Sequence, residues 1–335
     1  MRDVLAEVEQ WLAAGKEVAL ATVVQTWGSS PRPVGAKMAL TTENDIAGSV
    51  GGGCVEGAVI EAGKEVLATA VPQLLHFGVA DETAWDVGLA CGGSISVWVE
   101  RLDDAVFPFL RQHLHNDQPV TSITLLRGGY KLAFDRAGQR VGELGEWTET
   151  AVTRTQTLAH SQRLTLAEGV EAFVDVLVPA PLLVLVGGVH IAVALAAIAK
   201  TLDYCVVVID PRRAFGSAAR FPHVDRLIQA WPEKALAEVE LGVETAVALL
   251  SHDPKIDDPA LKVLLNSPVG YIGALGSKKT HAARVLRLRG MGFDEAVISR
   301  IHAPVGLEIG AQTPAEIALS IMAEIVKSKK LGIRD

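Results

Sequence analysis

The sequence predicts an α/β protein, with an N-terminal mixed α+β domain followed by a C-terminal Rossmann-like domain that has a doubly wound parallel sheet. The pattern after residue 180 is the first observation behind this prediction. There, continuous apolar runs alternate with amphipathic segments, which is typical of parallel strands covered by helices on both faces. The chain length is the second observation, since 335 residues suggest about two domains. The linker Pro179-Ala180-Pro181 places the boundary, giving domains over 1–178 and 181–335.

Helices and strands are mixed in the N-terminal domain. The prolines of segment 27–37 forbid a continuing strand ladder, so we expect a loop there. The middle part, 106–178, is expected to be rich in strands and carries no chemical motif. In chain order, the elements expected up to residue 115 are a helix over 4–14, a strand over 17–26, a hairpin over 38–41 and 46–50, a helix over 55–70, strands over 71–80 and 94–100, and a helix over 105–115.

Strands and helices alternate strictly in the C-terminal domain. The expected strands cover 182–186, 205–209, 226–229, 244–250 and 269–272. The expected helices cover 191–201, 232–238, 259–265 and 277–289, with a last helix after Thr313-Pro314.

Composition and charge argue against several classes of function. The formal net charge is −8 and the basic residues are scattered, whereas binding to nucleic acid needs concentrated Lys and Arg. The three cysteines form no CxxC pair, and the first segment is typical of an amphipathic helix rather than a signal peptide, so we expect a cytoplasmic protein. The uncharged stretch 176–199 contains prolines and a glycine pair, so we expect no membrane helix there and no membrane partner.

Two glycine-rich segments, 48–56 and 88–93, each contain a cysteine. Glycine at such density is usual where φ is positive or where the backbone lies against a ligand. Cys54 comes directly before a predicted helix whose dipole favours the thiolate, and Cys91 has similar glycine neighbours. The alternative for both is that cysteine is simply a small residue beside a glycine turn. The candidate ligand contacts in these segments are Gly51, Gly52, Gly53, Cys54 and Cys91.

The strand over 182–186 runs into a glycine turn and then a helix, which is the context of a dinucleotide-binding fingerprint. Asp210 follows the second strand, where an acid that binds ribose belongs, and Arg212 favours an extra phosphate. Val189 stands where the second fingerprint glycine would be, which disfavours NAD(P). The alternative is a tight turn and a strand cap without nucleotide contact. The candidate contacts are Gly187, Gly188, His190, Asp210 and Arg212.

Two further loops follow later strands, and parallel strands place their carboxyl ends at one edge of the sheet. His252 closes the fourth strand and is either a ligand or a structural histidine. Gly276 and Ser277 open a helix that is followed by two lysines, which gives a terminus suited to anions. His302, in the glycine-bearing loop 300–311, faces the same cleft or belongs to a structural wrap.

Taken together, these motifs resemble the XdhC/CoxI family, the xanthine dehydrogenase accessory proteins. The resemblance covers roughly residues 5–105 and 182–327. Where the family usually has Gly-Ala-Gly-His at the nucleotide-fold turn, this chain departs at Val189. The segments that carry the resemblance are Gly28-Ser29-Ser30-Pro31-Arg32, residues 48–56, residues 88–93, Asp210-Pro211-Arg212, Tyr271-Ile272-Gly273-Ala274-Leu275-Gly276-Ser277, and residues 300–311.

The resemblance implies a maturation factor that binds molybdenum cofactor (molybdopterin) and hands it, in sulfurated form, to a xanthine dehydrogenase-type molybdenum hydroxylase apoenzyme. It implies a carrier more than an enzyme, with a cysteine desulfurase as a further partner. Isolated apolar edges in the two α/β halves make a homodimer the expected assembly. The other interpretations are an NAD(P)-dependent oxidoreductase using the Rossmann-like domain, and an interaction module that docks the hydroxylase without holding cofactor.

A holder of this cofactor needs an anion site for the phosphate, flat glycine walls and a soft ligand. Cys54 is the candidate molybdenum ligand, and Arg32 and Lys37 are the nearest basic candidates for the pterin phosphate. Cys205, inside an apolar strand, is expected to be structural.

Overall fold

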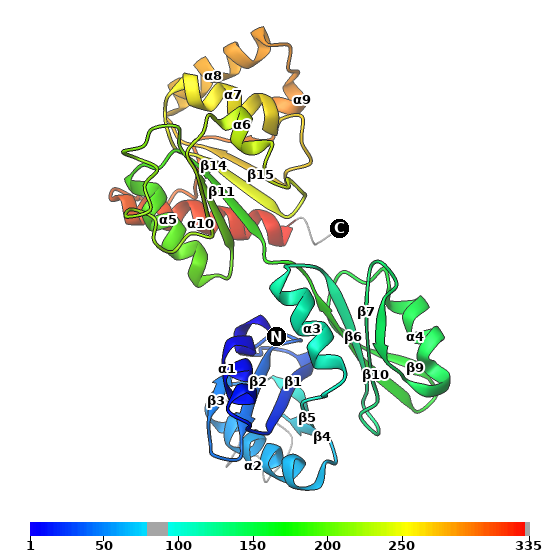
Figure 1. Ribbon diagram of the computed structural model, residues 1–335. Coiled ribbons are helices and arrows are strands. Elements are labelled where there is room, and N and C mark those ends of the chain that lie inside the picture. Colours follow the sequence, from blue (N-terminus) through cyan, green and yellow to red (C-terminus); the bar gives the residue numbers. More distant parts are fainter. Residues whose placement is uncertain (79–92, 332–335) are drawn as a thin grey trace. The chain divides into compact units, whose positions relative to one another are not determined.

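The computed structural model describes residues 1–78 and 93–331 (Figure 1). The chain divides into two compact units, Met1–Pro179 and Ala180–Asp335. In the described residues, the first unit holds two antiparallel sheets and the second holds one parallel sheet. The predicted α/β class and the Rossmann-like parallel sheet are confirmed.

The first sheet of the N-terminal unit has the strand order β3-β2-β1-β5-β4. Its core lies between β1, β2, β5 and one face of α2, where Val55, Val59 and Val66 are fully buried. Valine at a spacing of four and seven residues lies on one side of a helix, which explains why α2 packs there. The elements are α1 (Arg2–Ala13), β1 (Val18–Trp27), β2 (Lys37–Thr41), β3 (Ile46–Gly48), α2 (Cys54–Thr69), β4 (Gln73–Phe77) and β5 (Ser94–Arg101).

The second sheet of this unit has the order β8-β7-β6-β10-β9 and is built from the strand-rich middle part. Sequence patterns gave no helix within residues 120–178, and that expectation was wrong, because α4 forms there. This helix is polar and buries only two residues, Ala151 and Thr155, so it shows little apolar periodicity. The elements are α3 (Val106–His115), β6 (Val120–Leu125), β7 (Lys131–Asp135), β8 (Arg140–Gly142), the 3-10 helix η2 (Gly145–Trp147), α4 (Thr148–Thr155), β9 (Gln162–Ala167) and β10 (Val170–Leu177).

Ion pairs join the two sheets of the N-terminal unit in its interior. Lys37 on β2 contacts Asp175 on β10 at 2.7 Å, and both side chains are more than nine-tenths buried. A second buried pair joins Lys131 on β7 to Glu100 on β5. A cavity of about 20 Å³, enough for about one water molecule, lies among these groups. Burial alone would raise the pKa of Asp175, but Lys37 and the neighbouring donors outweigh it and hold this pKa below its usual range.

The C-terminal unit contains a parallel sheet of order β13-β12-β11-β14-β15-β16. Helices α5 and α10 pack on one face, and α6, α7, α8 and α9 pack on the other (Figure 1). The elements are β11 (Leu182–Val186), α5 (His190–Thr201), β12 (Cys205–Ile209), β13 (Arg226–Ile228), α6 (Pro232–Leu236), β14 (Thr245–Leu249), α7 (Pro254–Leu264), β15 (Tyr271–Ala274), α8 (Lys278–Gly290), α9 (Glu295–Ile298), β16 (Ile301–His302) and α10 (Pro314–Leu331).

Helix α7 begins five residues before the expected start at Pro259. Asp253 caps the helix by accepting a hydrogen bond from the Lys255 amide, and Pro254 occupies the first helical position, where proline is tolerated. Pro259 lies inside the helix. The predicted start at Pro259 was wrong because the helix contains two prolines, and the first of them, Pro254, marks its beginning.

No helix in the described residues is long and apolar enough to cross a membrane. The uncharged stretch 176–199 is divided among the end of β10, the strand β11 and the helix α5.

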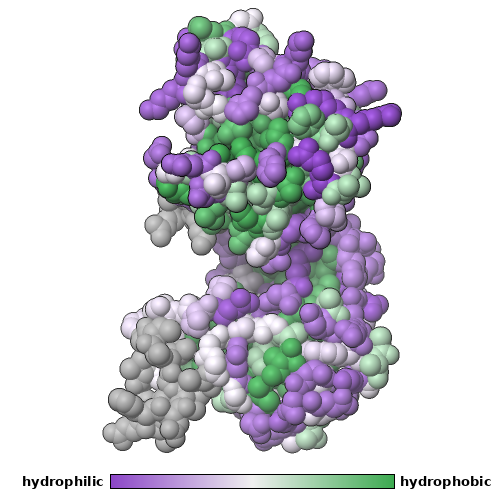
Figure 2. Space-filling view, turned by 90° about the vertical axis from the view of Figure 1, so that its left-hand side faces the viewer, coloured by the Kyte–Doolittle hydropathy of each residue, from purple (hydrophilic) through white to green (hydrophobic). Residues whose placement is uncertain are grey.

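Helix α5 is apolar on its outer side as well as on its buried side. Ile191, Val193 and Ile198 remain partly exposed, and Leu319 on the adjoining α10 is 52% exposed. Figure 2, which views the side where α5 and the first part of α10 lie, shows hydrophobic side chains gathered on this unit. The C-terminal unit thus has an apolar outer face.

Asp175→Asn is expected to lower the free energy of unfolding of the N-terminal unit by about 3–5 kcal/mol at pH 7, because it leaves the Lys37 charge buried and unpaired. Since the folded pKa of Asp175 is depressed, its contribution is present above the unfolded pKa of about 3.9 and is lost as pH falls through the folded value. Urea unfolding followed by tryptophan fluorescence, repeated from pH 7 to acid, measures both effects.

Glu61→Gln, which breaks the exposed pair with Lys64, is the matched control and should change stability by less than about 1 kcal/mol. Equal losses in the two variants would contradict the assignment of a stabilising role to the buried pair.

Candidate functional site

The glycine-rich segment 48–56 lies at one end of the first sheet. Strand β1 ends with Trp27 paired to Ser94 at the start of β5, and β2 begins beside the end of β3, where Met38 pairs with Gly48. The strand β4 ends beside the start of β5 as well. The strands β1, β3 and β4 therefore end on the same side of the sheet, which we call the loop end.

Arg32 holds two of these loops together. Its Nε donates to the Ser49 carbonyl at 3.1 Å, and its guanidinium contacts Asp3 at 3.1 Å. The Ser49 hydroxyl in turn donates to the Gly51 carbonyl and to Glu56 in the first turn of α2. Arg32 is 37% exposed at its side chain, so the predicted basic residue lies next to the glycine run with part of its charge open to solvent.

The glycine run forms the turn that leads into α2. Gly53 precedes the helix with φ at 51°, a conformation that favours glycine, and a side chain added at Gly52 or Gly53 would meet nothing within 4 Å. These two glycines are exposed, and Gly51 is half-buried against Val55. Open space beside a flat backbone leaves room for a ligand.

Cys54 is the first residue of α2, as the sequence predicted to within one residue. The side chain of Cys54 and the whole of Cys91 lie outside the described residues. Trp27, at the loop end of β1, is 73% exposed and was not identified from the sequence as a site residue. A tryptophan followed by Gly-Ser-Ser-Pro at the end of a strand is the signal that could have identified it.

Lys37 is not open to a pterin phosphate, as its candidate role requires. It is buried under the sheet, where its ammonium contacts Asp175 and donates to the Thr22 hydroxyl at 3.2 Å. A phosphate would have to displace a buried carboxylate to reach it, so the geometry favours a structural role for Lys37 and leaves Arg32 as the basic residue of the loop end.

In the C-terminal unit, Asp210 at the end of β12 is completely buried. Its carboxylate accepts from the Gly188 amide at 2.7 Å and from three nitrogens of Arg212 at 2.8–2.9 Å. Burial alone would raise the pKa of Asp210, but these hydrogen bonds outweigh it and lower the pKa. The acid predicted to bind a ribose therefore organises the glycine turn.

The glycine turn after β11 is closely packed. A side chain at Gly187, whose φ is 106°, would lie 2.9 Å from the Ser251 amide, and one at Gly188 would lie 2.5 Å from the Phe215 carbonyl. The ring of Phe215 stacks under Arg212 with 4.1 Å between the guanidinium carbon and the ring centre. With Asp210 also engaged, this turn is a poor fit for the pyrophosphate of NAD(P). His190 begins α5 and is exposed.

The loop after β14 contacts the glycine turn after β11 and the helix α7. His252 is exposed and has a φ of 59°, an uncommon value for histidine that turns the chain from β14 into α7. The Ser251 hydroxyl donates to Asp257 at 2.5 Å and accepts from the Asp253 amide. Burial is the main cause of a raised pKa at Asp257, against the lowering effects of Ser251 and Arg284.

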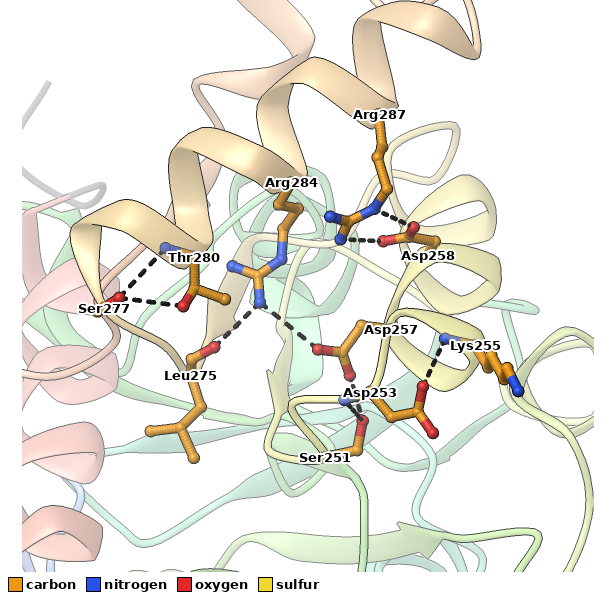
Figure 3. Close-up of polar contacts among 10 residues, drawn as sticks. All are labelled: Ser251, Asp253, Lys255, Asp257, Asp258, Leu275, Ser277, Thr280, Arg284 and Arg287. Carbon is orange, nitrogen blue, oxygen red and sulfur yellow. Dashed lines mark hydrogen bonds and ion pairs between the residues drawn. The ribbon is translucent and has the colours of Figure 1, made fainter.

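Gly276 and Ser277 lie at the start of α8, as predicted, and Ser277 caps the helix by accepting from the Thr280 amide at 3.2 Å. Beneath this turn lies Arg284, which donates to the Leu275 carbonyl at 3.0 Å and is 3.5 Å from Asp257 (Figure 3). The sequence interpretation missed Arg284, although its spacing of seven residues from Ser277 places both on one side of the helix. Three predicted loops thus meet at the carboxyl edge of the sheet, through Gly187, Ser251 and Leu275.

His302 lies on the opposite face of the sheet from Asp257 and Arg284. Its ring lies 4.7 Å from the ring of Tyr271, and its Nδ1 is 3.4 Å from Glu324 on α10. Burial and the hydrogen bond to Glu324 raise the pKa of Tyr271. These partners belong to the face covered by α5 and α10, whereas Asp257 and Arg284 belong to α7 and α8 on the other face.

Two models of known protein families match the chain, one in each unit. The model of the XdhC Rossmann domain matches residues 183–325, and the model of the XdhC and CoxI family matches residues 11–78. A protein of Bacillus subtilis (strain 168) that is named as a probable xanthine dehydrogenase subunit is 31% identical over 323 residues, which cover 94% of each chain. The chain belongs to the XdhC and CoxI family.

A further relative and a solved structure are also similar to this chain. The molybdenum cofactor insertion chaperone PaoD of Escherichia coli (strain K12) is 27% identical over 327 residues, covering 97% of this chain and 87% of PaoD. A crystal structure described as a xanthine dehydrogenase from Bacillus halodurans superimposes with a TM-score of 0.83 at 24% identity, covering 99% of this chain and 96% of that one. The second likeness shows the shared fold.

Within the residues that the structure describes, this XdhC-family chain has no group of three His, Cys, Asp or Glu side chains that could hold a metal ion. The residues that could contact a ligand are divided between the loop end of the first sheet and the carboxyl edge of the parallel sheet.

Gly188→Ala in this XdhC-family chain is expected to lower the free energy of unfolding by about 1–3 kcal/mol, because its Cβ would overlap the Phe215 backbone. Gly52→Ala, which adds the same methyl group in open space, should stay within about 0.5 kcal/mol of the wild type. Reversible unfolding in urea measures both variants, and a Gly188→Ala protein as stable as Gly52→Ala would show that the turn is not closely packed in solution.

Proposed function

We propose that this protein is a maturation factor that binds molybdenum cofactor and delivers it, in sulfurated form, to a xanthine dehydrogenase-type molybdenum hydroxylase. Membership of the XdhC and CoxI family and the similarity to a molybdenum cofactor insertion chaperone support this proposal. The structural observation that carries it is the loop end of the N-terminal unit, where Arg32, the exposed glycine turn and the start of α2 lie together.

The chemistry of the cargo fits this group of residues. Molybdenum cofactor is a pterin dithiolene that carries a phosphate, so its holder needs a positive group, a flat wall and a soft ligand. Arg32 offers a partly exposed guanidinium, which pairs well with phosphate, and Gly52 and Gly53 offer backbone without side chains. The exposed ring of Trp27 adds an aromatic surface at the same end of the sheet.

Cys54 supplies the soft ligand in this proposal. It stands at the N-terminus of α2, a helix of 16 residues, where the helix dipole favours a thiolate. A thiolate suits both molybdenum and the exchange of its terminal sulfur. Cys91 is the companion thiol in the proposal.

The remaining partners belong to the same proposal. A cysteine desulfurase would supply the sulfur, and the hydroxylase apoenzyme would receive the cofactor in the cytoplasm. A homodimer is the proposed assembly, and the apolar face of α5 and α10 supports it, because apolar side chains gathered on a surface often mark an interaction site. In this function the protein is a carrier rather than an enzyme.

Protein isolated without oxygen from a host that makes the cofactor is expected to contain molybdenum and a pterin in near-equal amounts. Metal analysis and the fluorescence of the oxidised pterin measure the two components. A preparation that contains neither, while a known molybdoenzyme from the same host is fully loaded, would contradict the proposal.

Cys54→Ser is expected to keep the fold and to retain at least about tenfold less pterin, because the hydroxyl is a poor substitute for a soft metal ligand. The matched control is Cys205→Ser on β12, which removes a thiol from the other unit and should leave the pterin content unchanged. Circular dichroism checks the fold of both variants. Wild-type pterin content in Cys54→Ser would remove this cysteine from the site.

A further inference from the structure

Arg284 is a buried cation with unused hydrogen-bonding capacity. Its side chain is 2% exposed, and Nη2 is engaged by the Leu275 carbonyl and by Asp257. Within the described part of the chain, its Nε and Nη1 have no hydrogen-bond partner. Native proteins rarely leave buried donors unpaired, so such groups point to a missing partner.

The charge of Arg284 is only partly balanced. Asp257 approaches at 3.5 Å, and one of its oxygens accepts from Ser251 at 2.5 Å. Its neighbour on the same helix, Arg287, differs in this respect, since it makes a two-pronged pair with Asp258 at 2.6 and 3.0 Å. Figure 3 shows both arginines on α8, and only the outer one is fully paired.

The first turn of α8 adds further positive charge beside Arg284. The helix sequence contains five Lys and Arg residues and no acid, in a protein whose net charge is −8. Lys278 and Lys279 are exposed at its start. The first amides of a helix have no partner within the helix, and the Ser277 hydroxyl accepts only the one from Thr280.

Thr280 lies beside the guanidinium of Arg284. Figure 3 shows Thr280 between Ser277 and the guanidinium, and Thr280 itself is exposed. The turn on this side of Arg284 carries the small side chain of Thr280 and contains Gly276, which is only half-buried. A rotation of Thr280 and a small shift of this turn would let an oxygen atom of a ligand reach the unpaired donors.

We propose that this turn is an oxyanion site for a phosphate group, formed by Arg284, the first amides of α8, and Lys278 with Lys279. A phosphate oxygen fits these donors because charged donors and helix N-termini both favour it. The phosphate belongs either to a nucleotide or to a phosphorylated pterin. The inference concerns the C-terminal unit and stands independently of the proposed cofactor delivery.

The test uses the full-length protein, freed of bound small molecules, and measures its melting temperature with sodium phosphate against sodium chloride at equal ionic strength. Phosphate is expected to raise the melting temperature by roughly 5 °C at about a hundred times its Kd, because a ligand that binds only the folded state stabilises it. Arg284→Gln should lose this rise, and Arg287→Gln, the matched control, should keep it. Absence of a phosphate-specific rise in the wild type would overturn the proposal.

Thr280→Glu is the second variant, needed because Arg284→Gln changes a buried residue and its failure to fold would give no melting curve to compare. The new carboxylate would take the place of the anion beside Arg284, so Thr280→Glu is expected to melt higher than the wild type and to respond no longer to phosphate. Ala282→Glu places the same charge at an exposed position of α8 and should keep the response. Equal responses of Thr280→Glu and Ala282→Glu would overturn the assignment.

Titration calorimetry with AMP and with the phosphorylated pterin released from an oxidised molybdoenzyme distinguishes the two sources of phosphate. The proposal is supported if the wild type binds one of these compounds more tightly than inorganic phosphate and Arg284→Gln does not. The compound that binds more tightly identifies the source. If both compounds bind Arg284→Gln as tightly as the wild type, the assignment of Arg284 fails. None of these measurements depends on whether the protein carries molybdenum.

Discussion

The buried carboxylate of Asp210 governs the carboxyl edge of the parallel sheet, because a charge removed from water must be hydrogen-bonded. It is held by the Gly188 amide, and this bond ties the end of β12 to the turn after β11. In that turn Gly187 lies against Ser251. The Ser251 hydroxyl donates to Asp257, which lies beside the guanidinium of Arg284 on α8. A chain of contacts therefore crosses the edge from strand to strand, and each loop is fixed by the one before it.

The parts of this arrangement that the sequence predicted depend on local patterns. Apolar runs predicted the strands, and Gly187 with Gly188 predicted a turn after β11, in which Gly187 has a positive φ. Ser277 was identified as a cap because its hydroxyl acts on an amide three residues away. Such interactions are set by neighbours in the chain, so they can be found from the order of residues alone.

The parts that escaped prediction depend on partners far along the chain. The sequence predicted a phosphate contact for Lys37, but the carboxylate that Lys37 contacts is 138 positions later and becomes a neighbour only when two sheets pack together. His302 lies against Tyr271 and an acid of α10 for the same kind of reason. Arg284 is buried on a helix with little apolar character, so no hydrophobic pattern marks the side that faces inward.

The parallel sheet of the C-terminal unit ends in very short strands on both sides. β13 contains three residues and β16 contains two, so little of the backbone at either edge is available to pair with another chain. Addition of a foreign strand, the common route from an open sheet to aggregation, has almost no template here. Contacts of this unit with another protein would therefore be made by side chains rather than by the backbone at the sheet edges.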